Sequence, residues 1–190
     1  MIVSGGVDVG VRGGAAAIGV DDNGVVRLLD AIDIPTTGVK AKERVDAIAL
    51  RSWLAKYQPQ HVYVERAQAL PRQGSSSGFK YGRAVGAIEA IIVCCEIPLT
   101  IIEPSAWKNF HHLYGKDEEG SRQRALQLFP AAHELFARKK DHGRAEAALI
   151  ALYGASLRPV GGQLPSKVAA KATPCPDPIP KIAQQGPNHA

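Results

Sequence analysis

The sequence predicts an α/β protein with a mixed five-stranded sheet and flanking helices. Three short runs of small and apolar residues open the chain and are joined by tight turns, which predicts strands linked as hairpins. Two later apolar runs alternate with helical patterns, as in strands connected by helices. With 190 residues, the chain is long enough for one domain with a sizeable core.

The first third of the chain carries the three hairpin-linked strands. Ile2–Val9 leads through a glycine-rich turn into Ala15–Val20. The Asp-Asp-Asn-Gly sequence at 21–24 is a strong hairpin signal before Val25–Ile34. Pro35 ends the third strand because proline lacks a backbone donor.

The rest of the domain alternates helices with two strands. Lys40–Tyr57 is typical of an amphipathic helix, with Val45, Ile48, Ala49 and Leu54 on one apolar stripe. The elements expected after it are a strand at His61–Glu65, a helix at Phe79–Cys95, a strand at Leu99–Glu103, a helical turn at Pro104-Ser105, and helices at Ser121–Leu128 and Asp141–Leu157.

Composition separates a folded domain at residues 1–158 from a basic Pro/Gly-rich tail at 159–190, which we expect to be disordered. The formal net charge of +5 favours an anionic partner such as nucleic acid, although three of those charges lie at or after Arg158.

No apolar run could span a membrane and no signal peptide is evident, so we expect a cytoplasmic protein, in a bacterium or a phage-infected cell, with an organelle as the alternative. The spacing of Cys94, Cys95 and Cys175 fits neither a disulfide framework nor zinc, which favours buried, reduced thiols.

Three acidic clusters stand on elements that belong to the core. Asp8 lies among small and apolar residues on the first strand, and Glu65 ends the fourth. Glu146 lies on the apolar stripe of the last helix, where an unpaired carboxylate is costly. Because side chains alternate along strands, Asp8 and Glu65 can converge on one face if their strands are neighbours. This pattern indicates a carboxylate site for Mg²⁺ or Mn²⁺, with two ions able to promote phosphodiester hydrolysis.

Each acid also has an ordinary structural interpretation. Asp8 could serve a turn, and Glu65 could pair with Arg66 at a strand end. Asp141 could cap the last helix, and His142 could simply be packed or exposed.

The chain resembles the RuvC-type Holliday junction resolvases of the ribonuclease H-like superfamily over residues 1 to about 157. The motifs that carry the resemblance are Gly6-Val7-Asp8-Val9-Gly10, Val62-Tyr63-Val64-Glu65, Lys80-Tyr81-Gly82-Arg83-Ala84-Val85-Gly86 and Ala145-Glu146-Ala147-Ala148-Leu149-Ile150-Ala151. The resemblance implies a homodimer that nicks four-way DNA junctions in pairs with Mg²⁺ or Mn²⁺. It implies strand one beside strand four, and ligand positions at Asp8, Glu65 and Glu146.

The fourth ligand position departs from the bacterial pattern, which has Asp or His where this chain has Gly143. Asp141 with Glu146 resembles the phage and chloroplast branch, so Asp141 is the preferred fourth metal ligand and His142 its rival. The resemblance also implies that Lys108, and less surely Lys116, steadies the transition state. The residues it implies for DNA binding are Arg66, Arg72, Phe79, Lys80, Tyr81 and Arg83. For Phe79 and Tyr81 the alternative is inward packing at a helix start. Small residues at 82, 84, 86, 87 and 90 would allow close approach of two subunits.

Three other functions remain as alternatives. Asp8-Val9-Gly10 also occurs at the first strand of actin-like ATPases and sugar kinases, but Val11-Arg12-Gly13 lacks their Thr or Ser. A ribonuclease H-like nuclease acting on RNA–DNA hybrids is the second alternative. The third is a junction-binding protein without catalysis.

Overall fold

The structure is a computed structural model that describes residues 1–39, 42–68, 74–113 and 118–157. The chain divides into one unit of Met1–Val160 and another of Gly161–Ala190. The predicted tail at 159–190, with Cys175, lies outside the described residues, and its disorder stays a prediction. In the described part of the chain, no helix combines the length and the apolar character needed to cross a bilayer.

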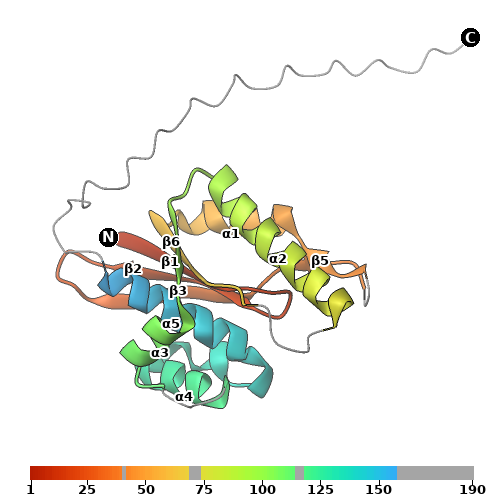
Figure 1. Cartoon of the computed structure of the whole chain (residues 1–190). Coiled ribbons are helices and arrows are strands. Elements are labelled where there is room, and N and C mark those ends of the chain that lie inside the picture. The colour runs from red at the N-terminus through yellow and green to blue at the C-terminus, as the bar shows by residue number, and fades with distance from the viewer. Residues whose placement is uncertain (40–41, 69–73, 114–117, 158–190) are drawn as a thin grey trace, which may run out of the picture. The chain divides into compact units, whose positions relative to one another are not determined.

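A five-stranded mixed sheet forms the centre of the first unit, as the sequence predicts (Figure 1). Its strands are β1 (Ile2–Asp8), β2 (Gly14–Val20), β3 (Val26–Asp33), β6 (His61–Glu65) and β7 (Leu99–Ile102). The order across the sheet is β3-β2-β1-β6-β7. The first three strands pair antiparallel, whereas β6 runs parallel to both β1 and β7. The predicted neighbourhood of strands one and four is therefore confirmed.

The helix expected over Lys40–Tyr57 is shorter than predicted. A two-stranded hairpin of β4 (Thr36–Thr37) and β5 (Arg44–Val45) precedes α1 (Ala47–Tyr57). Asp46 fixes the start of α1, because its carboxylate accepts the backbone N–H groups of the first turn. Residues 40–41 lie outside the described part.

The predicted apolar stripe of α1 is wrong at Ile48, which is 80% exposed. The residues that face the core are Leu50, Trp53 and Leu54. Val45 lies in β5, before the cap, so it does not share a helical stripe with Ile48.

Two helical layers cover the sheet (Figure 1). On one face, α1 and α2 (Ser75–Cys94) pack against valines of β1 and β6. On the other face lies α5 (His142–Ser156), which has a run of fully buried residues from Ala147 to Ala151. Outside α5 lie α3 (Pro104–Phe110), α4 (Glu118–Leu128) and the short 3₁₀ helices η2 (Pro130–Phe136) and η3 (Lys139–Asp141).

Two further predictions about α2 need correction. The helix begins at Ser75, four residues before the predicted start, so the serines at 75–77 form its first turn. Cys94 is exposed and Cys95 partly buried, which contradicts the prediction that both thiols are buried; both are free cysteines.

Candidate active site

Asp8 and Glu65 meet at the carboxyl ends of two adjacent parallel strands. Val7 of β1 pairs with Val64 of β6, so the residues that follow them lie side by side. Gly6, two residues before Asp8, faces α5. Since side chains alternate along strands, Asp8 and Glu65 both point to the α5 side of the sheet.

Glu146 reaches the same place from α5, because that helix packs directly on β1. A Cβ added to Gly6 would come 2.3 Å from both the Ala147 carbonyl oxygen and the Ala151 nitrogen. Only a glycine allows the two backbones to approach so closely. The Glu146 carboxylate is buried, and its Oε1 accepts a hydrogen bond of 3.0 Å from Ser121 Oγ.

One cleft of about 1120 Å³ joins these carboxylates. Asp8, Glu65, Glu146 and His142 all line it. Further charged and aromatic residues line the cleft from six different segments: Arg12, Arg66, Tyr81, Lys108, Glu119 and Lys139. The sequence-based expectation that Asp8, Glu65 and Glu146 share one site is consistent with this arrangement.

The acids influence one another's protonation. Burial raises the pKa of Glu65 above its ordinary value. The indole N–H of Trp107, which donates to Glu65 Oε1 at 3.0 Å, lowers that pKa in part. The negative charge of Glu146 raises it again, and the positive charge of Lys108 opposes that rise. Like charges held in one half-buried cleft are a condition that a divalent cation relieves.

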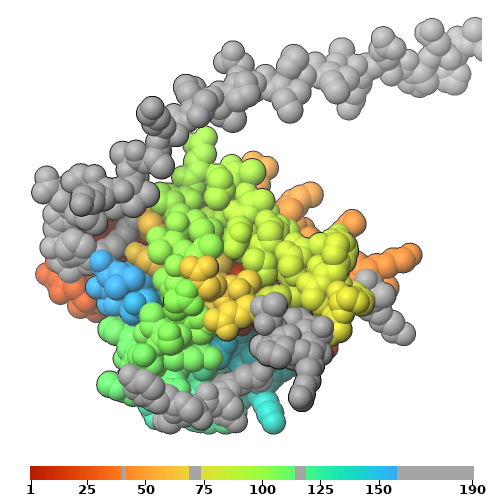
Figure 2. Space-filling model, in the orientation of Figure 1, coloured from red at the N-terminus to blue at the C-terminus, as the bar shows by residue number. Residues whose placement is uncertain are grey.

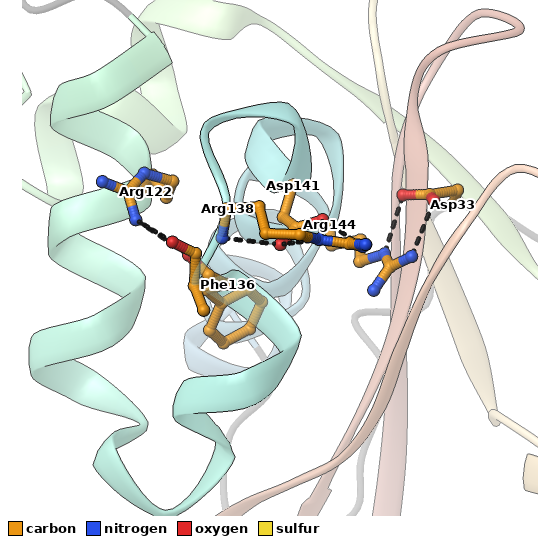
Figure 3. A network of polar contacts seen from close by, with 7 residues as sticks. Asp33, Arg122, Phe136, Arg138, Asp141 and Arg144 are labelled. Atoms are coloured by element: carbon orange, nitrogen blue, oxygen red, sulfur yellow. Dashed lines mark hydrogen bonds and ion pairs between the residues drawn. The ribbon is translucent and has the colours of Figure 1, made fainter.

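Asp141, the preferred fourth ligand, does not line this cleft. Its side chain is fully buried and faces Arg138 (Figure 3). Asp141 Oδ2 accepts the Arg138 backbone N–H at 2.9 Å, and Oδ1 accepts from the Arg138 guanidinium at 2.8 Å. Although burial alone would raise it, these hydrogen bonds hold the pKa of Asp141 below its ordinary value. Asp141 therefore lies outside the cleft, whereas the next residue, His142, lines it.

Gly143 stands where the resemblance to the bacterial resolvases implies an acid or histidine. A Cβ at Gly143 would come 2.7 Å from the Arg12 carbonyl oxygen, in the turn that follows β1. The start of α5 is also tied to the sheet edge, because Arg144 donates two hydrogen bonds to Asp33 at 2.7 and 2.6 Å (Figure 3). The missing side chain at 143 thus has a steric cause.

The residues in the cleft suit a hard divalent cation. Three carboxylates offer the oxygen donors that Mg²⁺ and Mn²⁺ prefer, and one imidazole adds a nitrogen donor that suits a transition ion better than Mg²⁺. Within the described ranges, no group of three His, Cys, Asp or Glu side chains is arranged so that it could hold an ion as it stands. The donor set nevertheless fits such an ion in its chemistry.

The residues expected to contact DNA are spread over the cleft and α2. Tyr81 lines the cleft, where burial and the charges of Glu65 and Asp8 raise its pKa. Phe79 is 67% exposed, which contradicts inward packing, and the Arg83 guanidinium lies 5.8 Å from its ring centre. Lys80 and Arg83 are exposed, Arg66 pairs with Glu103, and Lys108 lines the cleft. Arg72 and Lys116 lie outside the described residues.

Sequence reasoning missed four residues of this site. Arg12 and Lys139 are exposed cations that line the cleft, and Trp107 and Ser121 hydrogen-bond its carboxylates. Arg12 carried a usable signal, because it stands in the turn directly after the strand of Asp8. No such signal marked Lys139, Trp107 or Ser121, because their distance from the carboxylates depends on how α3, α4 and η3 pack.

Neither a protein-family model nor a curated protein matches this sequence. Solved structures do match its fold. Thermus thermophilus RuvC in complex with a Holliday junction substrate has 22% identity and a TM-score of 0.61, over 81% of this chain and 93% of that one. A second Thermus thermophilus RuvC structure has 21% identity and a TM-score of 0.60 over the same shares of the two chains. The yeast mitochondrial Holliday junction resolvase Ydc2 has 16% identity and a TM-score of 0.52, over 78% of this chain and 77% of that one. The chain therefore has the α/β fold of the RuvC-type Holliday junction resolvases, a ribonuclease H-like fold.

Proposed function

We propose that this protein is a structure-selective endonuclease that resolves four-way DNA junctions by paired, metal-dependent hydrolysis of phosphodiester bonds. The observation that carries the proposal is the cleft in which Asp8, Glu65 and Glu146 converge from two strands and a helix. The likeness in fold to resolvases, one of them bound to a Holliday junction, supports the choice of substrate.

Asp8, Glu65, Glu146 and His142 are the residues that would hold Mg²⁺ or Mn²⁺. Two such ions, when bound, would make the attacking water more acidic and offset charge on the leaving oxygen. Hydrolysis forms a bond from the water oxygen to phosphorus and breaks the bond to the 3′ oxygen, which leaves as a hydroxyl.

Cations around the carboxylates would hold the DNA strand. Lys108 projects from α3 into the cleft, and Arg12 and Lys139 line it from the β1–β2 turn and η3. Contacts of this kind position a backbone without reading its sequence, which suits an enzyme that selects a DNA shape. The exposed Phe79 ring would stack on unpaired bases at the crossover.

Paired cuts require two active sites, and we infer a homodimer that supplies them. Side chains of α2, yellow to yellow-green in Figure 2, form a broad part of the surface. Gly82, Gly86 and Ala90 are exposed there, as close approach of two subunits requires. Ala84, which was predicted on that face, is buried in the protein's own core, so it is not part of the proposed contact.

The decisive experiment compares cleavage of a mobile four-way junction, a linear duplex and an RNA–DNA hybrid, with and without Mg²⁺ or Mn²⁺. We expect symmetrical nicks in the junction only, and only with metal. Asp8→Asn should reduce the cleavage rate by at least about 10³-fold, because it removes a proposed metal ligand. It should keep junction binding, because cations largely hold a phosphodiester substrate. Preferential cutting of the hybrid would assign the chain to the other nuclease class, and binding without any cutting would leave a junction-binding protein. Thermal stabilisation by ATP would point to the ATPase alternative.

A further inference from the structure

Two hydrogen bonds hold the carboxylates of the cleft from outside it. Trp107 Nε1 donates to Glu65 Oε1 at 3.0 Å, and Ser121 Oγ donates to Glu146 Oε1 at 3.0 Å. The donors stand on α3 and α4, while the acceptors stand on β6 and α5. Each bond therefore crosses between elements far apart in the sequence.

Trp107 is fixed by its surroundings. Its ring is fully buried and packs with Leu149 and Ile150 of α5. Pro104 starts α3 directly after β7, which places this indole beside the end of the neighbouring strand β6. An indole N–H can only donate, so a rigid, buried indole dictates where one oxygen of Glu65 must lie.

Ser121 acts on Glu146 in a comparable way. It is 2% exposed, and a buried hydroxyl of this kind is worth most when its acceptor is charged. Ser4 offers a contrast, because it is 1% exposed and its Oγ has no hydrogen-bond partner in the described part of the chain. Burial of a serine in this protein thus does not by itself require a partner for the hydroxyl.

We propose that Trp107 and Ser121 are positioning residues of the metal site, each fixing one oxygen of a ligand carboxylate and so the orientation in which the carboxylate meets the cation. The inference rests on the proposed function. Outer partners that orient metal ligands typically contribute about 10–100-fold to metal affinity or activity. Their effect arises because an oriented ligand loses less conformational freedom when the ion binds.

The experiment measures Mn²⁺ affinity of the full chain without DNA, from the loss of the free Mn²⁺ signal in electron paramagnetic resonance. Trp107→Phe keeps the ring and removes the N–H, and Ser121→Ala removes the hydroxyl. We expect each variant to bind Mn²⁺ at least about tenfold more weakly than the wild type. Thermal unfolding without metal is measured for every variant, so that a loss of folding is seen separately.

Matched controls exist for both substitutions. Trp53 Nε1 donates to Asp30 Oδ2, also at 3.0 Å, at a place that does not line the cleft, so Trp53→Phe makes the same chemical change elsewhere. Ser4→Ala removes a buried hydroxyl without a partner. Both controls should bind Mn²⁺ as the wild type does.

The outcomes separate the two levels of the argument. Weaker Mn²⁺ binding by Trp107→Phe or Ser121→Ala, with both controls unchanged, supports the inference. In a second outcome, the wild type binds Mn²⁺, Asp8→Asn abolishes that binding, and both test variants bind Mn²⁺ as the wild type does. The inference is then wrong, while the proposed metal site stands. No Mn²⁺ binding by the wild type overturns both. Should Trp107→Phe fail to fold, Ser121→Ala alone decides.

Discussion

The close backbone approach between β1 and α5 at Gly6 can be tested by adding one methyl group. A Cβ at Gly6 would stand 2.3 Å from two backbone atoms of α5, whereas ordinary contact begins at 3.4 Å. The difference, 3.4 minus 2.3, means that α5 must move away from β1 by about 1.1 Å. Backbone atoms cannot rotate out of the way as a side chain can, so the helix itself has to shift.

This shift should reduce both stability and activity of Gly6→Ala. Overpacking a close contact costs about 1–3 kcal/mol, and two backbone contacts place this site at the upper end, about 2–3 kcal/mol. At about 2–4 °C per kcal/mol for a chain of this size, the melting temperature falls by about 4–12 °C. Because Glu146 moves with α5 relative to Asp8, cleavage falls by about 100-fold, the cost of a misplacement of about 1 Å.

Differential scanning calorimetry and single-turnover cleavage of a four-way junction measure the two effects. Gly78→Ala is the matched control for stability, because a Cβ at this position in α2 meets nothing within 4 Å. It should stabilise the protein by about 0.5–1 kcal/mol, as alanine does in place of glycine inside a helix. Wild-type stability and cleavage in Gly6→Ala would refute the view that close packing of α5 on β1 places Glu146.

Three further predictions concern charge, metal and pH. Arg12→Gln and Lys139→Gln should each weaken junction binding and reduce the slope of log affinity against log salt by about 1, measured by fluorescence anisotropy over a salt series; an unchanged slope would remove that residue from the phosphate contacts. His142→Asp should favour Mg²⁺ relative to Mn²⁺ in metal titrations of cleavage, because imidazole suits transition ions better than Mg²⁺; an unaltered Mn²⁺/Mg²⁺ ratio would contradict the place of His142 as a ligand. Burial lowers the pKa of His111 below its ordinary 6.5, so the unfolded chain binds more protons just below that pH and stability is lost as the pH falls through it. His111→Gln should therefore flatten the decrease in melting temperature between about pH 7.5 and 5.5, measured by calorimetry over a pH series, and an unchanged decrease would contradict this role of His111.

The meeting of Asp8 and Glu65 could be predicted from the sequence because it depends on strand periodicity and on one neighbour relation. A strand shows alternate residues on alternate faces whatever packs against it. Once β1 and β6 are adjacent and in register, no further information is needed to bring the two carboxylates together. The position of Glu146 on the apolar stripe of the last helix could be predicted for a similar reason, because its spacing to Leu149 and Ile150 depends only on helical periodicity.

Predictions that depended on where a helix begins were less successful. Ile48 was assigned to the core because the helix was expected from residue 40, but Asp46 caps a helix that starts at Ala47. The preference for Asp141 as fourth ligand had another basis, the resemblance to the phage and chloroplast branch. In the structure Asp141 ends a 3₁₀ turn and only His142 begins the α-helix. Helical spacing from Glu146 therefore applies to His142 and not to Asp141, whose side chain is turned to Arg138.

The glycine at 143 connects the packing of α5 with the composition of the ligand set. A Cβ at Gly14 would come 2.3 Å from the Gly143 carbonyl oxygen, and a Cβ at Gly143 would come 2.7 Å from the Arg12 carbonyl oxygen. This contact, together with the one at Gly6, brings α5 onto the sheet closely enough for Glu146 to share a cleft with Asp8. The same closeness leaves no space for a ligand side chain at 143. In the metal site that we propose, the fourth donor would then come from a neighbouring position, and His142, four residues before Glu146, lines the cleft.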